Sequence, residues 1–192
     1  MPQTFGAHRV LPEEPRREQF LDRDVCDTAG CTSDITESDS FDAIGGAYAR
    51  KHNPWVDFSN VPSEANQPFT AFPSDYARLP TVSFVIPDLN HDMHDGTIAQ
   101  ADQWLRDRLG GYAAWAPAHR SLLLVTADED DSSADNQIPT IIAGAFVRAG
   151  RYDERIDHYR LLSTLAHAHA YDVAAPGAAK AAKPITDIWS GQ

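Results

Sequence analysis

Three groups of residues in this chain could do acid–base or metal chemistry. They are the cluster His91, Asp92, His94 and Asp95, the acidic run from Asp128 to Asp131, and His158. Imidazoles and carboxylates bind calcium, magnesium, manganese, zinc and iron, and the residue types alone do not choose among these divalent metals. Adjacent carboxylates repel one another, so the acidic run is best tolerated beside a bound cation or in full contact with water. A metal site and a solvated acidic turn therefore both agree with the spacing.

Short apolar runs precede the first two groups and predict strands. Residues 81–86 (TVSFVI) are β-branched and apolar and end at Pro87, and residues 122–125 (LLLV) form an unbroken apolar run of the kind buried in a parallel sheet. Residues 138–146 give a third apolar segment. Ligands usually bind at the carboxyl ends of strands in open α/β sheets, so both groups are expected at a binding edge.

Helical patterns follow the strands. Residues 97–109 open with a Thr-x-x-Gln capping box at Thr97, carry apolar residues at helical spacing and are expected to end at the glycine pair 110–111. Residues 160–170 predict a second helix, whose apolar side is Leu161, Leu162 and Leu165. The alternation of strands and helices predicts an α/β fold with a mostly parallel sheet flanked by helices.

The overall composition bounds the function. The chain has 192 residues, of which 42% are hydrophobic and 23% charged, which is enough for one domain with a core. Residues 1–47 are predicted to be an irregular polar extension and residues 48–192 the folded domain. A formal net charge of -12 argues against nucleic-acid binding. No transmembrane segment and no signal peptide is expected in the sequence.

The two cysteines, Cys26 and Cys31, are separated by four residues. They could close a small disulfide loop if the protein matures outside the cytosol. A metal site there would need more ligands than these two thiols and the neighbouring carboxylates offer. The spacing therefore favours a disulfide.

Five segments of the chain carry a family resemblance. They are YARKHNPW at 48–55, FPSDYARLPTVSFVIPDLNHDMHDG at 72–96, LLLVTADEDD at 122–131, NQIPTIIAGAFVRAGRY at 136–152, and HYRLL from His158. Together they resemble the C-terminal half of the bacterial phosphoesterase family that includes secreted acid phosphatases and phospholipase C enzymes and is related to the alkaline phosphatase superfamily. The resemblance implies an alkaline-phosphatase-like fold, incomplete on its N-terminal side, that hydrolyses phosphate esters with a divalent metal ion.

The resemblance also implies roles for individual residues. Asp128 and Glu129 match the family's metal-binding Asp-Glu pair, and Asp92 is expected to ligate the metal or orient a neighbour. His94 is expected to face the phosphate or the leaving group. The catalytic set is thus predicted to be His94, His52, Asp92 and His158. The substrate-binding set is predicted to be Lys51 and His91, which would contact a phosphorylated small molecule or lipid headgroup.

One part of the family pattern has no match here. The resemblance gives no residue for the Ser or Thr nucleophile, so turnover by this chain is expected to be feeble. Alternatives are a catalytically incomplete remnant that binds metal or a phosphorylated ligand, a phospholipase C-type phosphodiesterase, and an interaction protein whose acidic clusters are merely solvated. An uncovered sheet edge would favour self-association. The resemblance implies an extracytoplasmic or secreted location.

Overall fold

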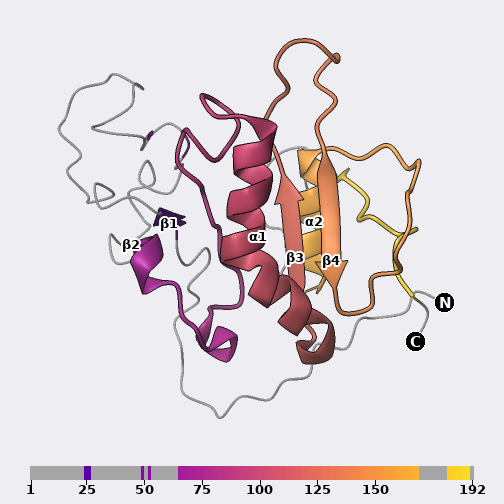
Figure 1. The fold of residues 1–192 in the computed structure, drawn as a ribbon. Helices are drawn as coiled ribbons and strands as arrows, with labels where there is room; N and C mark the ends of the chain where they lie inside the picture. The colour runs from indigo at the N-terminus through magenta and orange to yellow at the C-terminus, as the bar shows by residue number, and fades with distance from the viewer. Residues whose placement is uncertain (1–23, 27–48, 50–51, 53–64, 169–180, 191–192) are drawn as a thin grey trace. The chain divides into compact units, whose positions relative to one another are not determined.

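The structure is a computed structural model that describes residues 24–26, 49, 52, 65–168 and 181–190 (Figure 1). The chain divides into two compact units. One is Pro15–Tyr112, and the other includes Ala113–Gln192. Each unit is described below by itself.

Aromatic packing organises the described part of the Pro15–Tyr112 unit. Strand β1 (Asp24–Cys26) pairs in parallel with β2 (Asn66–Pro68), and 3₁₀ turns follow at Phe69–Ala71 and Tyr76–Arg78. The Phe69 ring lies 5.1 Å from that of Phe72 and 5.6 Å from that of the buried Trp104. These contacts anchor a proline-rich segment that has little regular structure of its own.

The helix α1 (Ile98–Trp115) begins where the capping box predicts. The backbone N–H of Thr97 donates to Gln100 Oε1 at 2.8 Å, and the Gln100 N–H donates to Thr97 Oγ1 at 3.3 Å. The expected end at residues 110–111 is wrong, because the helix continues to Trp115. A β-carbon at Gly111 would lie 2.4 Å from the Tyr76 hydroxyl oxygen, so this glycine makes room for a packed ring. Tertiary packing here outweighs a helix cost of about 1 kcal/mol per glycine.

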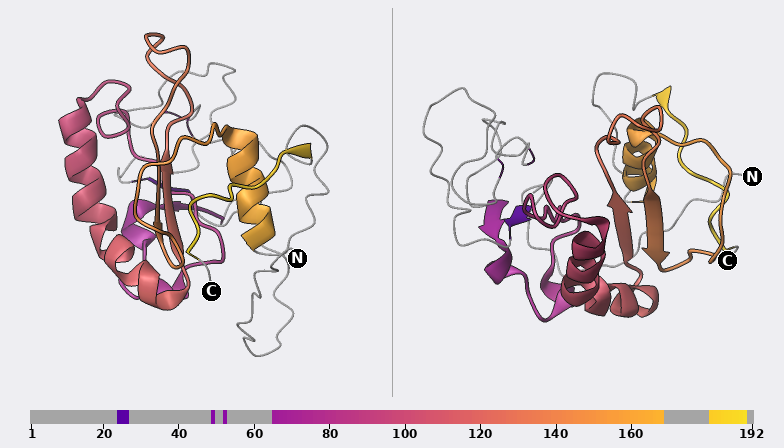
Figure 2. Two further views of the ribbon diagram at one scale, coloured as in Figure 1. Left: turned by 90° about the vertical axis from the view of Figure 1, so that its right-hand side faces the viewer. Right: turned by 45° about the horizontal axis from the view of Figure 1, so that its top comes forward.

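The second unit is built on an antiparallel strand pair. After a 3₁₀ turn at Ala116–His119, strand β3 (Leu122–Thr126) pairs with β4 (Thr140–Gly144), with Leu122 opposite Gly144 and Thr126 opposite Thr140. Helix α2 (His158–Ala168) packs on one face of this pair (Figure 2). The core between them consists of Leu161, Ile185 and Ile188, with Leu124, Ile142, Tyr152, Ile156 and Trp189 packed around it. The C-terminal segment is therefore part of the core.

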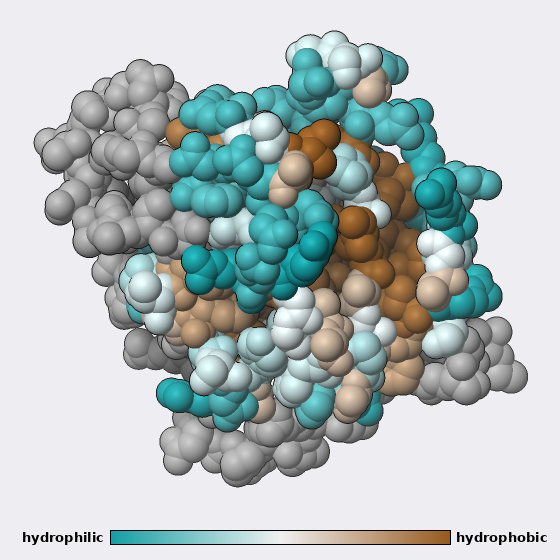
Figure 3. Space-filling model, viewed as in Figure 1, coloured by the Kyte–Doolittle hydropathy of each residue, from teal (hydrophilic) through white to brown (hydrophobic). Residues whose placement is uncertain are grey.

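The opposite face of this strand pair carries exposed apolar surface. Ile141 of β4 is 57% exposed, and Figure 3 shows hydrophobic residues gathered over β3 and β4. Such a surface agrees with the predicted tendency to self-associate, which stays a prediction.

The predicted mostly parallel sheet is wrong for β3 and β4. Residues 127–139 join them as a loop with turns and contain no helix. Parallel neighbours need a crossover connection, usually helical, whereas a direct loop returns the chain antiparallel. The predicted strand at 81–86 is also wrong, because the assigned strand pairs are β1–β2 and β3–β4 and this segment belongs to neither. A β-branched run becomes a strand only where a neighbour supplies the ladder.

Two further predictions concern parts of the chain with limited description. Cys31 and the side chain of Cys26 lie outside the described residues, and so does most of the extension 1–47. In the part that is described, no helix is long and apolar enough to cross a membrane.

Candidate active site

A tightly bonded turn carries the first predicted group, and residues 88–96 are called the histidine loop here. The buried carboxylate of Asp88 accepts the Asn90 N–H at 3.0 Å and bonds to His91 Nδ1 at 2.6 Å. At the other end of the loop, a β-carbon on Gly96 would lie 1.8 Å from the Asn90 carbonyl oxygen. This close approach requires glycine, so the loop has one well-defined path between residues 81–86 and α1.

Asp88 also determines what His91 does. Because an ionised carboxylate only accepts hydrogen bonds, His91 Nδ1 carries the proton in this contact. No sequence motif assigned a role to Asp88, which follows the apolar run 81–86 and Pro87. The structure thus places His91 as a support of the loop, and its predicted contact with substrate stays a prediction.

His52 joins the histidine loop from 40 residues away in sequence, bonding through Nδ1 to Asp92 Oδ2 at 2.8 Å. The two side chains are 20% and 15% exposed, so this pair is largely shielded from water. The other oxygen of Asp92 accepts the backbone N–H of His94 at 2.8 Å. One carboxylate therefore fixes both His52 and the backbone of His94, and the catalytic roles that the resemblance implies for these three residues stay predictions. Lys51, the expected phosphate contact, lies outside the described residues.

His94 is held in a similar way. Its Nδ1 bonds to Asp95 Oδ1 at 2.8 Å, and its ring centroid lies 5.4 Å from that of His52. Since each carboxylate accepts, both imidazoles carry a proton on Nδ1, and in the neutral ring the lone pair is then on Nε2. Such a carboxylate-held imidazole is suited to accept a proton, to donate one once charged, or to bind a metal.

The second group lies on residues 127–137, called the acidic loop here. Asp130 accepts three backbone N–H groups, from Ala134 at 2.7 Å, Ser132 at 2.9 Å and Asn136 at 3.1 Å. These bonds, that of Ala134 foremost, hold the pKa of Asp130 below its usual value. Ser132, Asp135 and Asn136 have positive φ, so the backbone curls around this carboxylate. Asp130 is thus a structural acid.

The remaining acids of this loop differ from one another. Asp131 bonds to the backbone and hydroxyl of Ser133 and is taken up by the turn. Asp128 accepts only the N–H of the next residue, Glu129, at 3.0 Å, and both side chains are exposed. Asp131 is also exposed, so the run contains one acid bound by several backbone N–H groups, Asp130, and three exposed acids, Asp128, Glu129 and Asp131. The resemblance implies that Asp128 and Glu129 are metal ligands, and this stays a prediction.

His158 supports the acidic loop from α2. Its Nε2 lies 3.0 Å from the backbone oxygen of Asp128, and since a carbonyl only accepts, this nitrogen is protonated. The preceding Asp157 accepts the Arg160 N–H at 2.9 Å, a helix-capping contact that fixes where α2 begins. His158 thus holds the backbone that carries Asp128. The predicted catalytic role of His158 would therefore be indirect, through the position of the Asp128 backbone.

The acids meet part of the requirement for a metal site. Solvent-facing carboxylates of Asp128 and Glu129 are donors that suit calcium, magnesium and manganese. In the described part of the chain, no group of three or more His, Cys, Asp or Glu side chains is gathered to hold a metal ion. The donor chemistry therefore fits a divalent cation, and the full ligand set stays a prediction.

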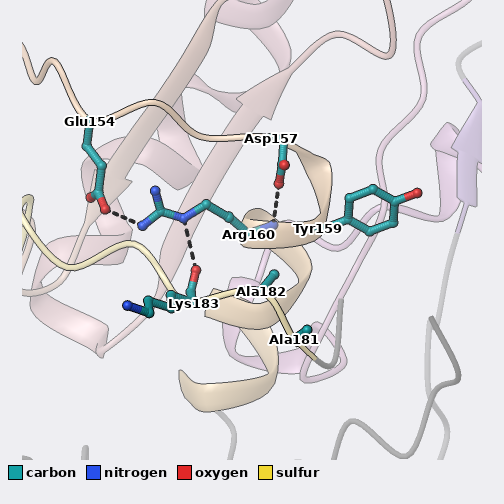
Figure 4. Close-up of a pocket in the computed structure, with 7 residues that line it drawn as sticks. All are labelled: Glu154, Asp157, Tyr159, Arg160, Ala181, Ala182 and Lys183. Atoms are coloured by element: carbon teal, nitrogen blue, oxygen red, sulfur yellow. Dashed lines mark hydrogen bonds and ion pairs between the residues drawn. The ribbon is translucent and has the colours of Figure 1, made fainter. Parts of the chain in front are cut away.

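An open pocket lies elsewhere, beside the start of α2 (Figure 4). It is lined by Glu154, Asp157, Tyr159, Arg160, Ala181, Ala182 and Lys183. The Arg160 guanidinium pairs with Glu154 and donates to the backbone oxygens of Lys183 and Arg155. Because these contacts occupy it, the guanidinium is not available to bind a phosphate.

Comparisons of the sequence with family models and with known proteins agree on one family. Residues 28–171 match the Phosphoesterase family. The chain is 54% identical over 162 residues to a phosphatidylinositol-3-phosphatase of Mycobacterium tuberculosis, with 83% of this chain and 54% of that protein covered. It is 31% identical over 137 residues to a probable acid phosphatase of Kluyveromyces lactis, which covers 62% of this chain and 31% of that protein. A phosphate-repressible acid phosphatase of Penicillium chrysogenum is 30% identical over 131 residues.

The chain spans about half the length of the first of these relatives, at 54%, and about a third of the other two, at 31% and 32%. No solved structure gives a significant match to the chain. An alkaline-phosphatase-like fold therefore stays an expectation of the resemblance.

Proposed function

The chain belongs to the Phosphoesterase family, and we propose that it acts on phosphate monoesters with the help of a divalent cation. The relatives named above are phosphatases, which supports a phosphoric ester hydrolase. The structural observation that carries the proposal is the bond between His52 and Asp92, at 2.8 Å, beside the ring of His94. It unites two motifs far apart in sequence into one pair of carboxylate-held imidazoles.

The roles follow from the hydrogen bonds. Asp92 keeps His52 protonated on Nδ1, which leaves Nε2 to donate to a phosphate oxygen once the ring is charged. His94, fixed by Asp95, donates a proton to the leaving oxygen as a general acid. Lys51 supplies a positive charge that offsets the net charge of -12 around an anionic substrate.

Asp128 and Glu129 are the proposed metal ligands. Their support is the resemblance together with their exposure, since Asp130 is held by three backbone N–H groups while the side chains of Asp128 and Glu129 are exposed. A bound divalent cation stabilises negative charge that develops on phosphoryl oxygens. His158 contributes by holding the Asp128 carbonyl. The identity of the metal is left open among calcium, magnesium, manganese, zinc and iron.

We further propose that turnover by this chain is slow. The sequence offers no match for the family's Ser or Thr nucleophile, and a covalent intermediate divides ester hydrolysis into two easier steps. Hydrolases that lose their reacting side chains retain roughly 10³ to 10⁴-fold catalysis over water from the rest of the site. Feeble but measurable hydrolysis by water is the expected behaviour.

Turnover of a chromogenic phosphomonoester, measured from acid to neutral pH with each metal, tests the proposal. The His94→Ala variant should lose about 10² to 10⁴-fold, the usual contribution of a general acid. His119→Ala is the matched control, because His119 is an exposed histidine stacked on Trp115 at 4.1 Å and takes no part in the site. Equal turnover by wild type and His94→Ala would overturn the assignment. Robust turnover that His94→Ala abolishes would instead refute the slow-turnover proposal.

A second function is binding without turnover, favoured by the same missing nucleophile. In that case a divalent metal or inorganic phosphate would raise the unfolding midpoint by mass action while no ester is cleaved. A phosphodiester substrate assayed beside the monoester separates the phospholipase C-type alternative. The substrate would be a phosphorylated small molecule or a lipid headgroup, and an extracytoplasmic location is part of the proposal.

A further inference from the structure

The histidine loop is buried where it begins and exposed towards its end. Asp88 is 5% exposed, whereas the side chains of residues 93–95 are open to solvent. Met93 has a φ of 77°, in the left-handed region that is unfavourable for a residue with a β-carbon. Such a backbone conformation persists only where the surrounding structure enforces it. The exposed end of the loop therefore depends on how its beginning is held.

Asp88 accepts hydrogen bonds from the residues that follow it in the loop. Its Oδ1 accepts the Asn90 N–H at 3.0 Å and the protonated Nδ1 of His91 at 2.6 Å. Its backbone oxygen accepts the N–H groups of His91 at 2.8 Å and of Asp92 at 3.0 Å. One buried residue thus bonds to the backbone of Asn90, His91 and Asp92. The last of these carries the carboxylate that bonds to His52.

His91 connects this turn to helix α1. Its ring centroid lies 6.3 Å from that of Trp104, and the two rings are tilted by 32°. Trp104 is 6% exposed and packs on Phe69, with 5.6 Å between the ring centroids. The His91 side chain therefore has the Asp88 carboxylate and a buried residue of the helix as neighbours. Groups that are supported from a helix are held more precisely than groups that only a loop supports.

We propose that Asp88 is a positioning residue for the reaction, whose side chain holds the turn that keeps Asp92 within bonding distance of His52. The contacts run from Trp104 through His91 to Asp88, and from the Asp88 backbone oxygen to the Asp92 N–H. Asp88 and His91 act through these contacts and do not touch the substrate. The inference rests on the proposed function, because that proposal assigns the chemistry to His52, Asp92 and His94.

Loss of the Asp88 side chain has a defined consequence for the loop. Without its two bonds at Oδ1 the turn is free to relax, and the unfavourable φ of Met93 drives that relaxation. Asp92 lies in between and would move away from His52. A displacement of about 1 Å at a reacting group can cost about 100-fold in rate, so even a small shift is measurable.

Asp88→Ala removes the acceptor of both side-chain bonds. Its kcat should fall about tenfold, the lower end of the range for an orienting partner, because Asp88 acts through Asp92. KM should change little, since no contact with substrate is lost. Asp88→Asn keeps an oxygen that can accept from Asn90 and His91, so it should recover most of the wild-type kcat.

The bond between His52 and Asp92 can be observed directly by NMR of the chain with ¹⁵N-labelled histidine. The His52 Nδ1–H signal, assigned by its loss in His52→Gln, should be protected from water in the wild type and in Asp88→Asn. In Asp88→Ala this proton should exchange faster. The measurement needs no turnover. If the wild type cleaves no ester, the proposed function fails, while the NMR signal still decides whether Asp88 positions the pair.

Asp75→Ala is the matched control in the same unit. Asp75 also accepts the N–H two residues further on, that of Ala77 at 3.2 Å, and has no part in the proposed site. This variant should keep the wild-type kcat and the wild-type His52 signal. If folded Asp88→Ala keeps the wild-type signal or, with an active wild type, the wild-type kcat, the inference is refuted. A loss in Asp88→Asn or Asp75→Ala as large as in Asp88→Ala refutes it as well.

His91→Phe keeps the test decisive if Asp88→Ala does not fold. The variant keeps a ring beside Trp104 but removes the donor to Asp88. It should lower kcat with little change in KM, and its His52 Nδ1–H should exchange faster than in the wild type. A raised KM with a wild-type His52 signal would mean that His91 contacts the substrate, and this would overturn the inference. Wild-type behaviour of His91→Phe would overturn it equally.

Discussion

The histidine loop and the acidic loop use the same residue type in opposite ways. In residues 88–96, Asp92 and Asp95 bond to imidazoles and fix which nitrogen carries the proton. In residues 127–137, Asp130 collects backbone N–H groups and fixes the shape of its own turn. The two loops differ in the hydrogen-bond partner of the carboxylate, which is an imidazole in one and the backbone in the other. They do not differ in the charge of the carboxylate or in its position after an apolar run.

This contrast shows how to separate chemical from structural acids in a cluster. A carboxylate that accepts several backbone N–H groups is already satisfied, so it gains little by binding a cation. A carboxylate that positions an imidazole can take part in acid–base chemistry, and an exposed carboxylate such as that of Asp128 can still bind a cation. By this criterion Asp92, Asp95, Asp128 and Glu129 are the acids proposed to take part in the chemistry, and Asp130 is the structural acid.

Asp92→Asn should give the largest effect on the histidine side of the comparison. The amide weakens the bond that holds His52, and loss of such an orienting partner typically costs about 10 to 100-fold in activity. The unfolding midpoint should change little, because the Asn oxygen can still accept the His94 N–H. Steady-state kinetics beside thermal unfolding of the same preparation would measure both. A matching loss of stability would mean that Asp92 is a structural acid after all.

Asp130→Ala should have a smaller effect, and this effect should be on stability and not on activity. The variant should lose stability at neutral pH, while metal binding and turnover change less than in Asp92→Asn. Because the folded pKa of Asp130 is lowered, its contribution is present above the ordinary Asp pKa and is lost as pH falls through the lowered value. Unfolding midpoints of wild type and variant should therefore converge in strong acid. A difference that stays constant with pH would contradict the assigned role.

Local signals predicted some elements but wrongly predicted a strand at residues 81–86, and they predicted longer-range order less well. The apolar run gave β3 and the capping box gave the start of α1, because both depend on neighbouring residues. The antiparallel pairing depends on whether residues 127–139 form a crossover helix, which the acidic composition alone did not decide. In α2 the expected apolar residue Leu162 is 47% exposed, whereas Ser163 and Thr164 are buried. Their hydroxyl bonds to the C-terminal segment compensate for that burial.

Candidate site residues could be predicted where they belong to a sequence motif. Residues whose only role is to hold another side chain in place could not. The resemblance placed His52, Asp92, His94 and His158 in one catalytic set, and the structure shows contacts among the first three while His158 bonds to the Asp128 backbone oxygen. The anchoring role of Asp88 on His91 was missed, since it depends on burial. The contacts of Arg160 with Glu154 and Pro184 were also missed, and the second joins residues that are 24 positions apart, which no local pattern marks.

Isothermal titration with calcium, magnesium, manganese and zinc tests the central claim that Asp128 and Glu129 bind a divalent cation. Asp128→Asn and Asp135→Asn each remove one charge from the acidic loop, and Asn tolerates the positive φ of 54° at residue 135. Wild type should bind at least one of these metals. Asp128→Asn should weaken that binding by more than the roughly 10 to 100-fold typical of an outer-shell partner, and Asp135→Asn should leave it nearly unchanged. No binding by the wild type, or equal weakening in both variants, would contradict the account.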